Sequence, residues 1–374
     1  MTLSLYIARK FLRAFLLVLL GFWGILILID TIEQLRGFPE GTISLLQAAG
    51  LAALNVPASL YAILPLIVVL ASVVLFLGLS RSSELVVIRA AGRSALRMLV
   101  APVVVAALLG AAMVAIGNPI ITALTNRYEQ LSATLSGTGR ETISIGREGV
   151  WMRQSAQWTD SSGTVHPGQA VIHSERGNSD GTELFDVTFM IFDRAANPVR
   201  RIEADRALLT PGAWQMFNAK DWSLASSTNP ERDSSRTVML NLPSSLTADS
   251  IRESFGNPNE IAIWDLPKFI RGLKDAGFST RRHLVWFQME LALPLIFVSM
   301  VLLTAGFTMR HTRFGRTGMM VLLALASGLA VFFLRNVTQV LGDNGQLPVS
   351  LAAWTPPAVA LLLALALLLH LEEG

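Results

Sequence analysis

The chain has 374 residues, of which 52% are hydrophobic and only 15% are charged. Soluble domains carry about 25% charged residues, so this composition excludes an ordinary soluble protein and predicts an integral membrane protein. Cysteine is absent, which excludes disulfides, thiol nucleophiles and cysteine metal sites. The net charge of +3 is too small to indicate a nucleic-acid partner.

The hydropathy pattern predicts six membrane-spanning helices, because six stretches approach the roughly 20 apolar residues that cross a bilayer. They cover residues 14–29, 56–79, 98–117, 287–307, 317–336 and 350–369. Residues 41–80 contain no charge, and we expect Pro57 and Pro65 to divide them into a short interfacial helix and the second span. The first stretch has the basic start of a signal peptide, but no cleavage site follows it, so we expect it to be retained.

Basic residues gather on one side of the predicted spans. They precede the first span and lie between spans two and three and between spans four and five, at Arg9, Lys10, Arg13, Arg81, Arg89, Arg93, Arg97, Arg310, Arg313 and Arg316. The positive-inside rule therefore places both chain termini in the cytoplasm and the long segment after span three outside it.

That polar insert, residues 118–282, reads as β-strands. Phe185, Val187, Phe189 and Ile191 alternate with Asp186, Thr188 and Met190, which is the period of a half-buried strand. Turn signals separate further short runs at residues 149–154, 169–174, 200–210, 214–224 and 237–242. Such strands indicate a sandwich or an open barrel, and residues 257–277 read as a helical return to the membrane.

The domain division follows from these elements. Residues 1–117 hold spans one to three, residues 118–282 form the β insert, and residues 283–374 hold spans four to six. The predicted fold class is therefore an α-helical membrane protein with an inserted all-β domain.

Motifs for catalysis are missing from the sequence. There is no P-loop, no H-E-x-x-H and no G-x-S-x-G, so we predict no enzyme activity, no cofactor and no metal site, including at His166 and His173. Acids are scarce within the spans, and Glu290 is the exception. We expect Glu290 to lie near the interface and to face water or a partner; a proton relay is the sharper alternative.

The segment between spans two and three predicts a short amphipathic helix over residues 82–93. Leu85 to Ile88 form an apolar patch, Glu84 and Arg89 are charged, and Gly92 can end the helix. Two interpretations stay open at this point. The helix lies on anionic lipid, or it docks a cytoplasmic partner.

The same residues resemble a known family, the lipopolysaccharide-export ABC transporter permeases LptF and LptG. Ser83–Gly92 reads S-E-L-V-V-I-R-A-A-G, which is similar to the family's coupling helix, and the resemblance covers nearly the whole chain. It extends to residues 6–13, 149–151, 291–294, 333–342 and 347–348. Residues 30–36 and the long fifth span resemble the LptG branch more than LptF.

The resemblance implies six transmembrane helices with a periplasmic β-jellyroll-like domain between helices three and four, in the inner membrane of a Gram-negative bacterium. It implies a permease subunit that extracts lipopolysaccharide and passes it to a periplasmic bridge. The implied partners are an LptF-like subunit, an LptB-like ATPase dimer that hydrolyses the ATP, and an LptC-like single-span jellyroll protein.

The resemblance also implies roles for single residues. ATPase coupling falls to Glu84, Leu85, Arg89 and Gly92. Lipid binding falls to residues near the outer ends of spans one and five and on their apolar stripes, namely Asp30, Glu33, Arg36, Phe22, Leu26, Phe332 and Arg335. A slide for acyl chains in the β domain would include Trp151, Phe185, Phe189 and Trp214.

Alternatives remain for each of these roles. Arg36 and Arg335 are also explained as interfacial anchors, and the anchor is favoured for Arg335. Asp30 and Glu33 repel anions, so they are also explained by a divalent cation or the paired subunit. The apolar stripes are also explained by lipid-facing packing, and the aromatic residues of the insert by a closed core. The alternative function is a non-transporting scaffold that relays ATPase strokes to a periplasmic assembly.

Overall fold

The computed structural model describes residues 2–38, 43–82, 84, 95–136, 143–146, 149–159, 164–178, 181–225, 227, 229–244, 246–247, 251, 257–275, 278–309 and 317–373. The chain divides into two compact units. We call them the membrane unit (Met1–Gly137, Ala262–Trp264 and Arg281–Gly374) and the sheet unit (Thr138–Ile261 and Asp265–Thr280).

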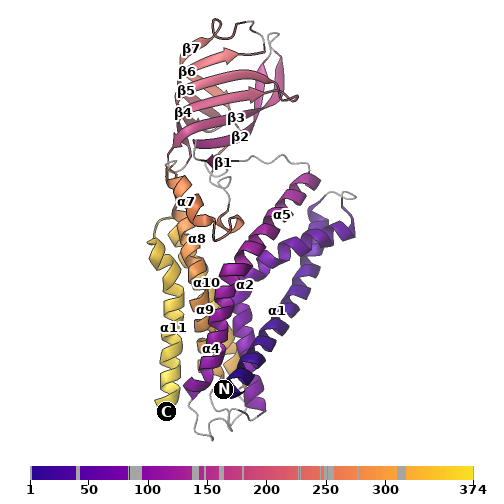
Figure 1. The fold of residues 1–374 in the computed structure, drawn as a ribbon, viewed down its shortest axis with the longest axis vertical. Coiled ribbons are helices and arrows are strands. Elements are labelled where there is room, and N and C mark those ends of the chain that lie inside the picture. The colour runs from indigo at the N-terminus through magenta and orange to yellow at the C-terminus, as the bar shows by residue number, and fades with distance from the viewer. Residues whose placement is uncertain are drawn as a thin grey trace. The chain divides into compact units, whose positions relative to one another are not determined.

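The membrane unit consists of long apolar helices (Figure 1). They are α1 (Thr2–Gly37), α2 (Leu45–Arg81), α4 (Ala95–Ala112), the π turn η1 (Met113–Gly117), α5 (Asn118–Ser136), α8 (Arg281–Leu291), α9 (Leu293–Thr308), α10 (Thr317–Asp343) and α11 (Val349–Glu373). Within the described ranges, five helices are long and apolar enough to cross a membrane, and the bent pair α8–α9 would add a sixth.

Helix α2 differs from its prediction. It is one helix from Leu45 to Arg81, so the expected separate interfacial helix before Pro57 is wrong. The Ser44 side chain caps the first turn, and the Gln47 side chain accepts a hydrogen bond from the Ser44 backbone at 2.8 Å. Both prolines lie inside the helix, which is bent along its length as proline produces (Figure 1). Close packing by neighbouring helices makes such prolines tolerable.

The third span also continues beyond its predicted end. Helicity passes through the π turn and along α5 to Ser136, so the membrane unit ends later than the drop in hydropathy at Gly117. Hydropathy indicates only which residues prefer lipid. A helix continues beyond them as long as its backbone hydrogen bonds continue. The fourth span, in contrast, is broken between Leu291 and Leu293, and α8 and α9 meet at 49°.

The sheet unit is a seven-stranded antiparallel sheet. Its strands are β1 (Ile143–Gly146), β2 (Gly149–Thr159), β3 (Val165–Gly177), β4 (Glu183–Phe192), β5 (Pro198–Thr210), β6 (Ala213–Ser223) and β7 (Ser235–Pro243). Each predicted strand run falls within one of them, except that Leu224, the last residue of the run 214–224, lies beyond the end of β6. Their order in space follows the chain, so the described strands form a meander and lack the Greek-key crossings of a jellyroll.

One face of the sheet carries the core of this unit. Phe189 and Trp214 are fully buried there, and Leu273 of α7 (Leu266–Asp275) and Phe278 belong to the same cluster. Position 177 requires glycine, because a Cβ there would lie 2.6 Å from Phe278 Cζ. The helical return expected at residues 257–277 is thus a short turn, η2 (Pro258–Glu260), followed by α7, which covers the sheet.

Candidate functional site

The Glu84 carboxylate, just beyond the end of α2, is bound by the first turns of α1. Lys10 Nζ donates to Oε1 at 2.9 Å, and the Tyr6 hydroxyl donates to Oε2 at 3.2 Å. Ser82 Oγ adds a third donor, 2.8 Å from Oε1. Tyr6 and Lys10 reach one carboxylate because residues four apart share a helix face. The sequence analysis missed this cluster, although that spacing of Tyr6 and Lys10 was visible.

These contacts fix the charge of Glu84. Partial burial by itself raises the pKa of the Glu84 carboxyl, but hydrogen bonds from Lys10 and Ser82 outweigh it and leave the pKa below its usual range. The group is therefore ionised at neutral pH and offers a charge-assisted acceptor that can exchange one donor for another. The other predicted coupling residues, Leu85, Arg89 and Gly92, lie outside the described residues.

The charged residues near the end of α1 do not form one surface. Asp30 accepts a hydrogen bond from Asn55 Nδ2 at 3.0 Å, which ties α1 to α2. Glu33 and Arg36 are exposed, and Arg36 lies in the last turn of the helix. Arg36 is thus the member of this group that is free to meet an external anion, while Asp30 is engaged inside the unit.

The predicted apolar stripes lie on weakly covered helices. Phe22 and Leu26 of α1 are half-buried, as is Phe332 of α10. Phe332 packs edge-to-face against Phe333 at a centroid distance of 6.1 Å, and Phe333 is exposed. These faces suit lipid or another apolar helix.

Glu290 differs most from expectation. Glu290 has no exposed surface, so the predicted position facing water or a partner near the interface is wrong. The Tyr61 hydroxyl of α2 donates a hydrogen bond to Glu290 Oε2. Arg335 is half-buried, and its positive charge lies close enough to act on Glu290.

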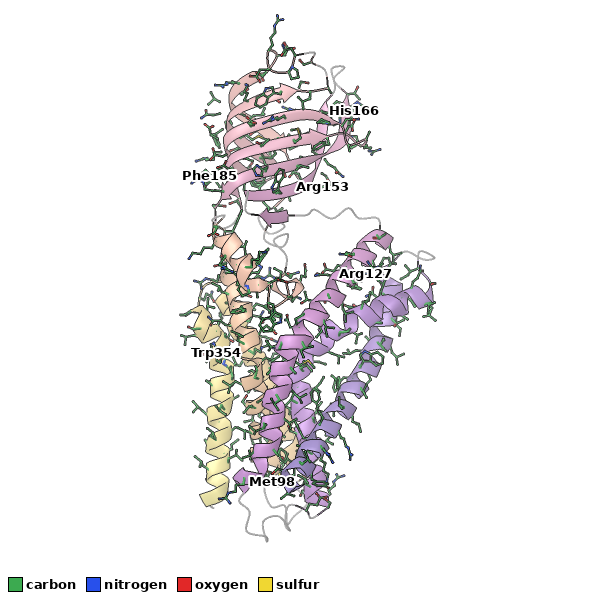
Figure 2. The ribbon with its side chains drawn as sticks, in the orientation of Figure 1. Met98, Arg127, Arg153, His166, Phe185 and Trp354 are labelled. Carbon is green, nitrogen blue, oxygen red and sulfur yellow. The ribbon has the colours of Figure 1, made fainter. Side chains whose placement is uncertain are left out.

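The four aromatic residues of the proposed slide are divided between two environments. Phe189 and Trp214 are fully buried and meet edge-to-face at 6.0 Å, as a closed core requires. Trp151 is 44% exposed and stacks on His173 at 4.3 Å. Phe185 is half-buried and lies off the buried face of β4, at the opposite end of the strands from His166 (Figure 2).

Asp186 explains the position of Phe185. Its φ of +51° interrupts the strand alternation, so Leu184 takes the buried face in place of Phe185. Asn218 in β6 has a similar φ of +55°. Aspartate and asparagine adopt this left-handed conformation more readily than other residues with side chains, and their presence within predicted strands was the available signal.

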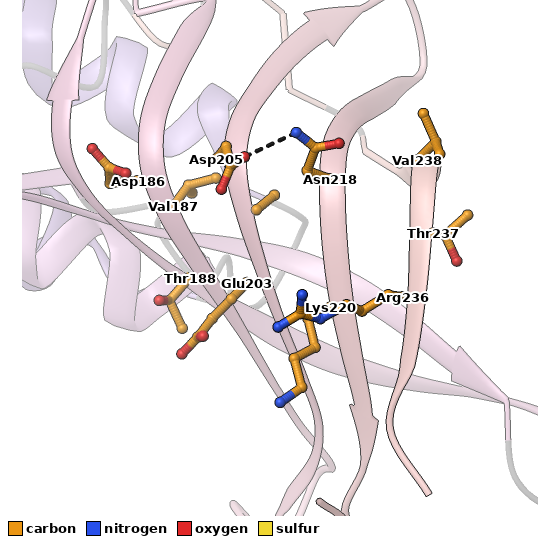
Figure 3. A pocket seen from close by; sticks show the side chains of 11 residues that line it. Asp186, Val187, Thr188, Glu203, Asp205, Asn218, Lys220, Arg236, Thr237 and Val238 are labelled. Carbon is orange, nitrogen blue, oxygen red and sulfur yellow. Dashed lines mark hydrogen bonds between the residues drawn. The ribbon is translucent and has the colours of Figure 1, made fainter.

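A polar groove of about 640 Å³ follows these two irregularities across β4 to β7 (Figure 3). Acids and bases both line it, and Asn218 donates a hydrogen bond to Asp205 at 2.9 Å. Its charged lining comprises Asp186, Glu203, Asp205, Lys220 and Arg236. Such a lining suits water and polar groups rather than an acyl chain.

The described part of the chain defines a multi-pass membrane protein with a β unit, because it holds five long apolar helices, a broken helix pair and an inserted antiparallel sheet. The chain matches the family "Lipopolysaccharide export system permease LptF/LptG" over residues 5–370, and it belongs to that family.

Two relatives are named lipopolysaccharide export system permease protein LptG. The chain is 23% identical over 348 residues to that of Haemophilus influenzae, covering 92% of this chain and 90% of the relative. It is 22% identical over 378 residues to that of Escherichia coli K12, covering 98% of both. The resemblance found in the sequence is confirmed, and both relatives carry the name of the predicted branch.

Proposed function

We propose that the chain is the LptG-like half of an ABC transporter that extracts lipopolysaccharide from the inner membrane and passes it to a periplasmic bridge. One observation carries the proposal: the family match runs from residue 5 to residue 370, so it includes the helices and the sheet together. ATP hydrolysis falls to a separate LptB-like ATPase dimer, in keeping with the missing P-loop.

The Glu84 cluster is the proposed contact with the ATPase. An ionised carboxylate with three exchangeable donors can accept a basic group of a partner in place of Lys10. Leu85, Arg89 and Gly92 complete the proposed coupling segment. The basic residues around this segment support a cytoplasmic position for it and for both termini, and a periplasmic position for the sheet unit.

The proposed lipid path begins at the exposed guanidinium of Arg36, because Arg binds phosphate with two parallel hydrogen bonds. Glu33 and Asp30 precede it on α1, and Arg335 of α10 lies close enough for its charge to act on Glu290. The apolar faces with Phe22, Leu26 and Phe332 meet acyl chains and an LptF-like subunit. Trp151 and Phe185, outside the closed core, are the members of the aromatic set left available to lipid or to an LptC-like protein.

Photo-crosslinking tests the proposal directly. A photoreactive amino acid replaces Arg36 in one variant and Trp151 in another, within the complex isolated from its native membrane. A matched control carries it at Val238, which is 80% exposed and borders the polar groove. We expect ATP-dependent adducts with lipopolysaccharide at positions 36 and 151 and none at 238. Adducts with protein alone would favour the scaffold over the transporter.

A further inference from the structure

A carboxylate lies fully buried at the bend of the broken span. Glu290, the second-last residue of α8, has no exposed surface, and the Tyr61 hydroxyl donates to its Oε2. Asn118 Nδ2 lies 3.5 Å from the same oxygen. An ionisable group in a membrane span is unfavourable unless it has partners, and it marks a functional site by default.

Four helices contribute to the environment of this carboxylate. Tyr61 comes from α2, Asn118 begins α5, Glu290 ends α8, and Arg335 of α10 supplies an attractive positive charge. Removal of one partner of a buried hydrogen bond leaves the other polar group unsatisfied. The arrangement of these helices is therefore sensitive to each member of the cluster.

Asn118 connects the cluster to a separate piece of chain. Its Oδ1 accepts a hydrogen bond from the buried backbone N–H of Ile263 at 2.9 Å. The next residue, Trp264, donates its indole N–H to the Ala115 carbonyl at 3.0 Å, within the π turn η1. Single π turns inside helices occur frequently at functional sites.

The segment that receives these bonds has an unusual place in the chain. Ala262–Trp264 belongs to the membrane unit, whereas the chain before and after it belongs to the sheet unit. A displacement of Asn118 would thus act on the backbone that leads, in both directions, into the sheet unit.

We propose that Tyr61, Asn118 and Glu290 form a polar joint that transmits movement of the bent span α8–α9 to the segment Ala262–Trp264, and through it to the sheet unit. The inference rests on the proposed function, in which ATP-driven movement of the helices must reach the β domain. Glu290 and Asn118 are positioning residues, because they act through the backbone of Ile263 rather than on lipid.

Cysteine labelling tests the joint, because the chain contains no cysteine of its own. Ala262→Cys provides a single thiol, and the rate of its reaction with a maleimide is measured in the full complex, with and without trapped nucleotide. Glu290→Leu, Tyr61→Phe and Asn118→Ala are each combined with it. Ser72→Ala is the matched control, because the buried Ser72 hydroxyl donates to Val68 O within its own helix α2.

In the otherwise unchanged protein we expect nucleotide to alter the labelling rate at position 262. Each joint variant should raise the basal rate by roughly five- to tenfold, as the loss of one buried hydrogen bond implies, and should abolish the nucleotide effect. The use of three variants keeps the test valid if one of them does not fold, and Ser72→Ala should behave like the parent.

Equal labelling in the parent and in the folded joint variants, with and without nucleotide, would overturn the joint. Joint variants that lose lipid release but keep the labelling of the parent would also overturn the joint, and the proposed function would remain supported. Nucleotide-dependent labelling that the joint variants abolish, in a parent complex that moves no lipopolysaccharide, would support the joint and reject the lipid function.

Discussion

Replacement of Gly110 by Ala should separate α4 from α9 beside the bend of the fourth span. A Cβ at Gly110 would lie 2.5 Å from Pro294 Cα and 3.0 Å from Pro294 N. Carbon atoms in contact lie about 3.5–4.0 Å apart, so the two helices must move apart by roughly 1 Å. The obstacle is backbone, which cannot rotate away, and overpacking of this kind costs about 1–3 kcal/mol.

Gly24→Ala in α1 is the matched control, because a Cβ there would meet nothing within 4 Å. That change should stabilise the protein by about 0.5–1 kcal/mol, since alanine loses less backbone entropy than glycine in a helix. Both variants gain this entropy term, so they should differ by the overpacking cost alone, about 1–3 kcal/mol in the free energy of unfolding. Reversible denaturation in detergent micelles measures this difference, and equal stabilities would refute the close approach of α4 and Pro294.

Four further predictions concern other parts of the chain. Glu84→Gln should reduce co-purification of the ATPase, whereas Lys10→Met should not, because it frees the Glu84 carboxylate; a pull-down with each variant checks this. The folded pKa of Glu84 lies below its ordinary 4.5. The Lys10–Glu84 contact should therefore persist above pH 4.5 and be lost as the pH falls through the folded value. Its loss should lower the stability of the protein by at most about 1 kcal/mol. Phe189→Ala should destabilise the sheet unit by about 3–5 kcal/mol and expose it to limited proteolysis, whereas the half-exposed Trp151→Ala should leave the cleavage pattern unchanged. Asp186→Val should lower the melting temperature, because a β-branched residue at φ +51° costs about 1–2 kcal/mol; Asp186→Asn should be near neutral, and the opposite ranking would contradict the irregularity in β4.

The apolar helices and the strand runs were predictable, because both depend on local patterns of hydrophobicity. The errors occur where packing overrides a local rule. Pro57 and Pro65 indicate helix ends in isolation, yet α2 continues through both. Asn118 follows the last apolar stretch of span three, yet the helix continues because its side chain bonds inside the membrane unit.

The candidate sites were predictable to a smaller extent. Glu84 stood out by its motif, but its partner Lys10 comes from a helix 74 positions away in sequence. The burial of Glu290 depends on Tyr61, which is 229 positions away. No periodicity reveals such pairs, since they arise only when distant helices pack. The aromatic residues of β4 were assigned to one face by alternation, and the left-handed Asp186 made that assignment wrong for Phe185.

The short segment Ala262–Trp264 has a consequence for domain exchange among relatives. A conventional inserted domain is attached at its two ends only and can be swapped as a cassette. Here a third attachment interrupts the insert, since Ile263 and Trp264 bond to Asn118 and Ala115 of the membrane unit. A chimera that imports residues 138–280 from a homologue must therefore preserve this internal anchor, or the grafted domain will be held at its ends alone.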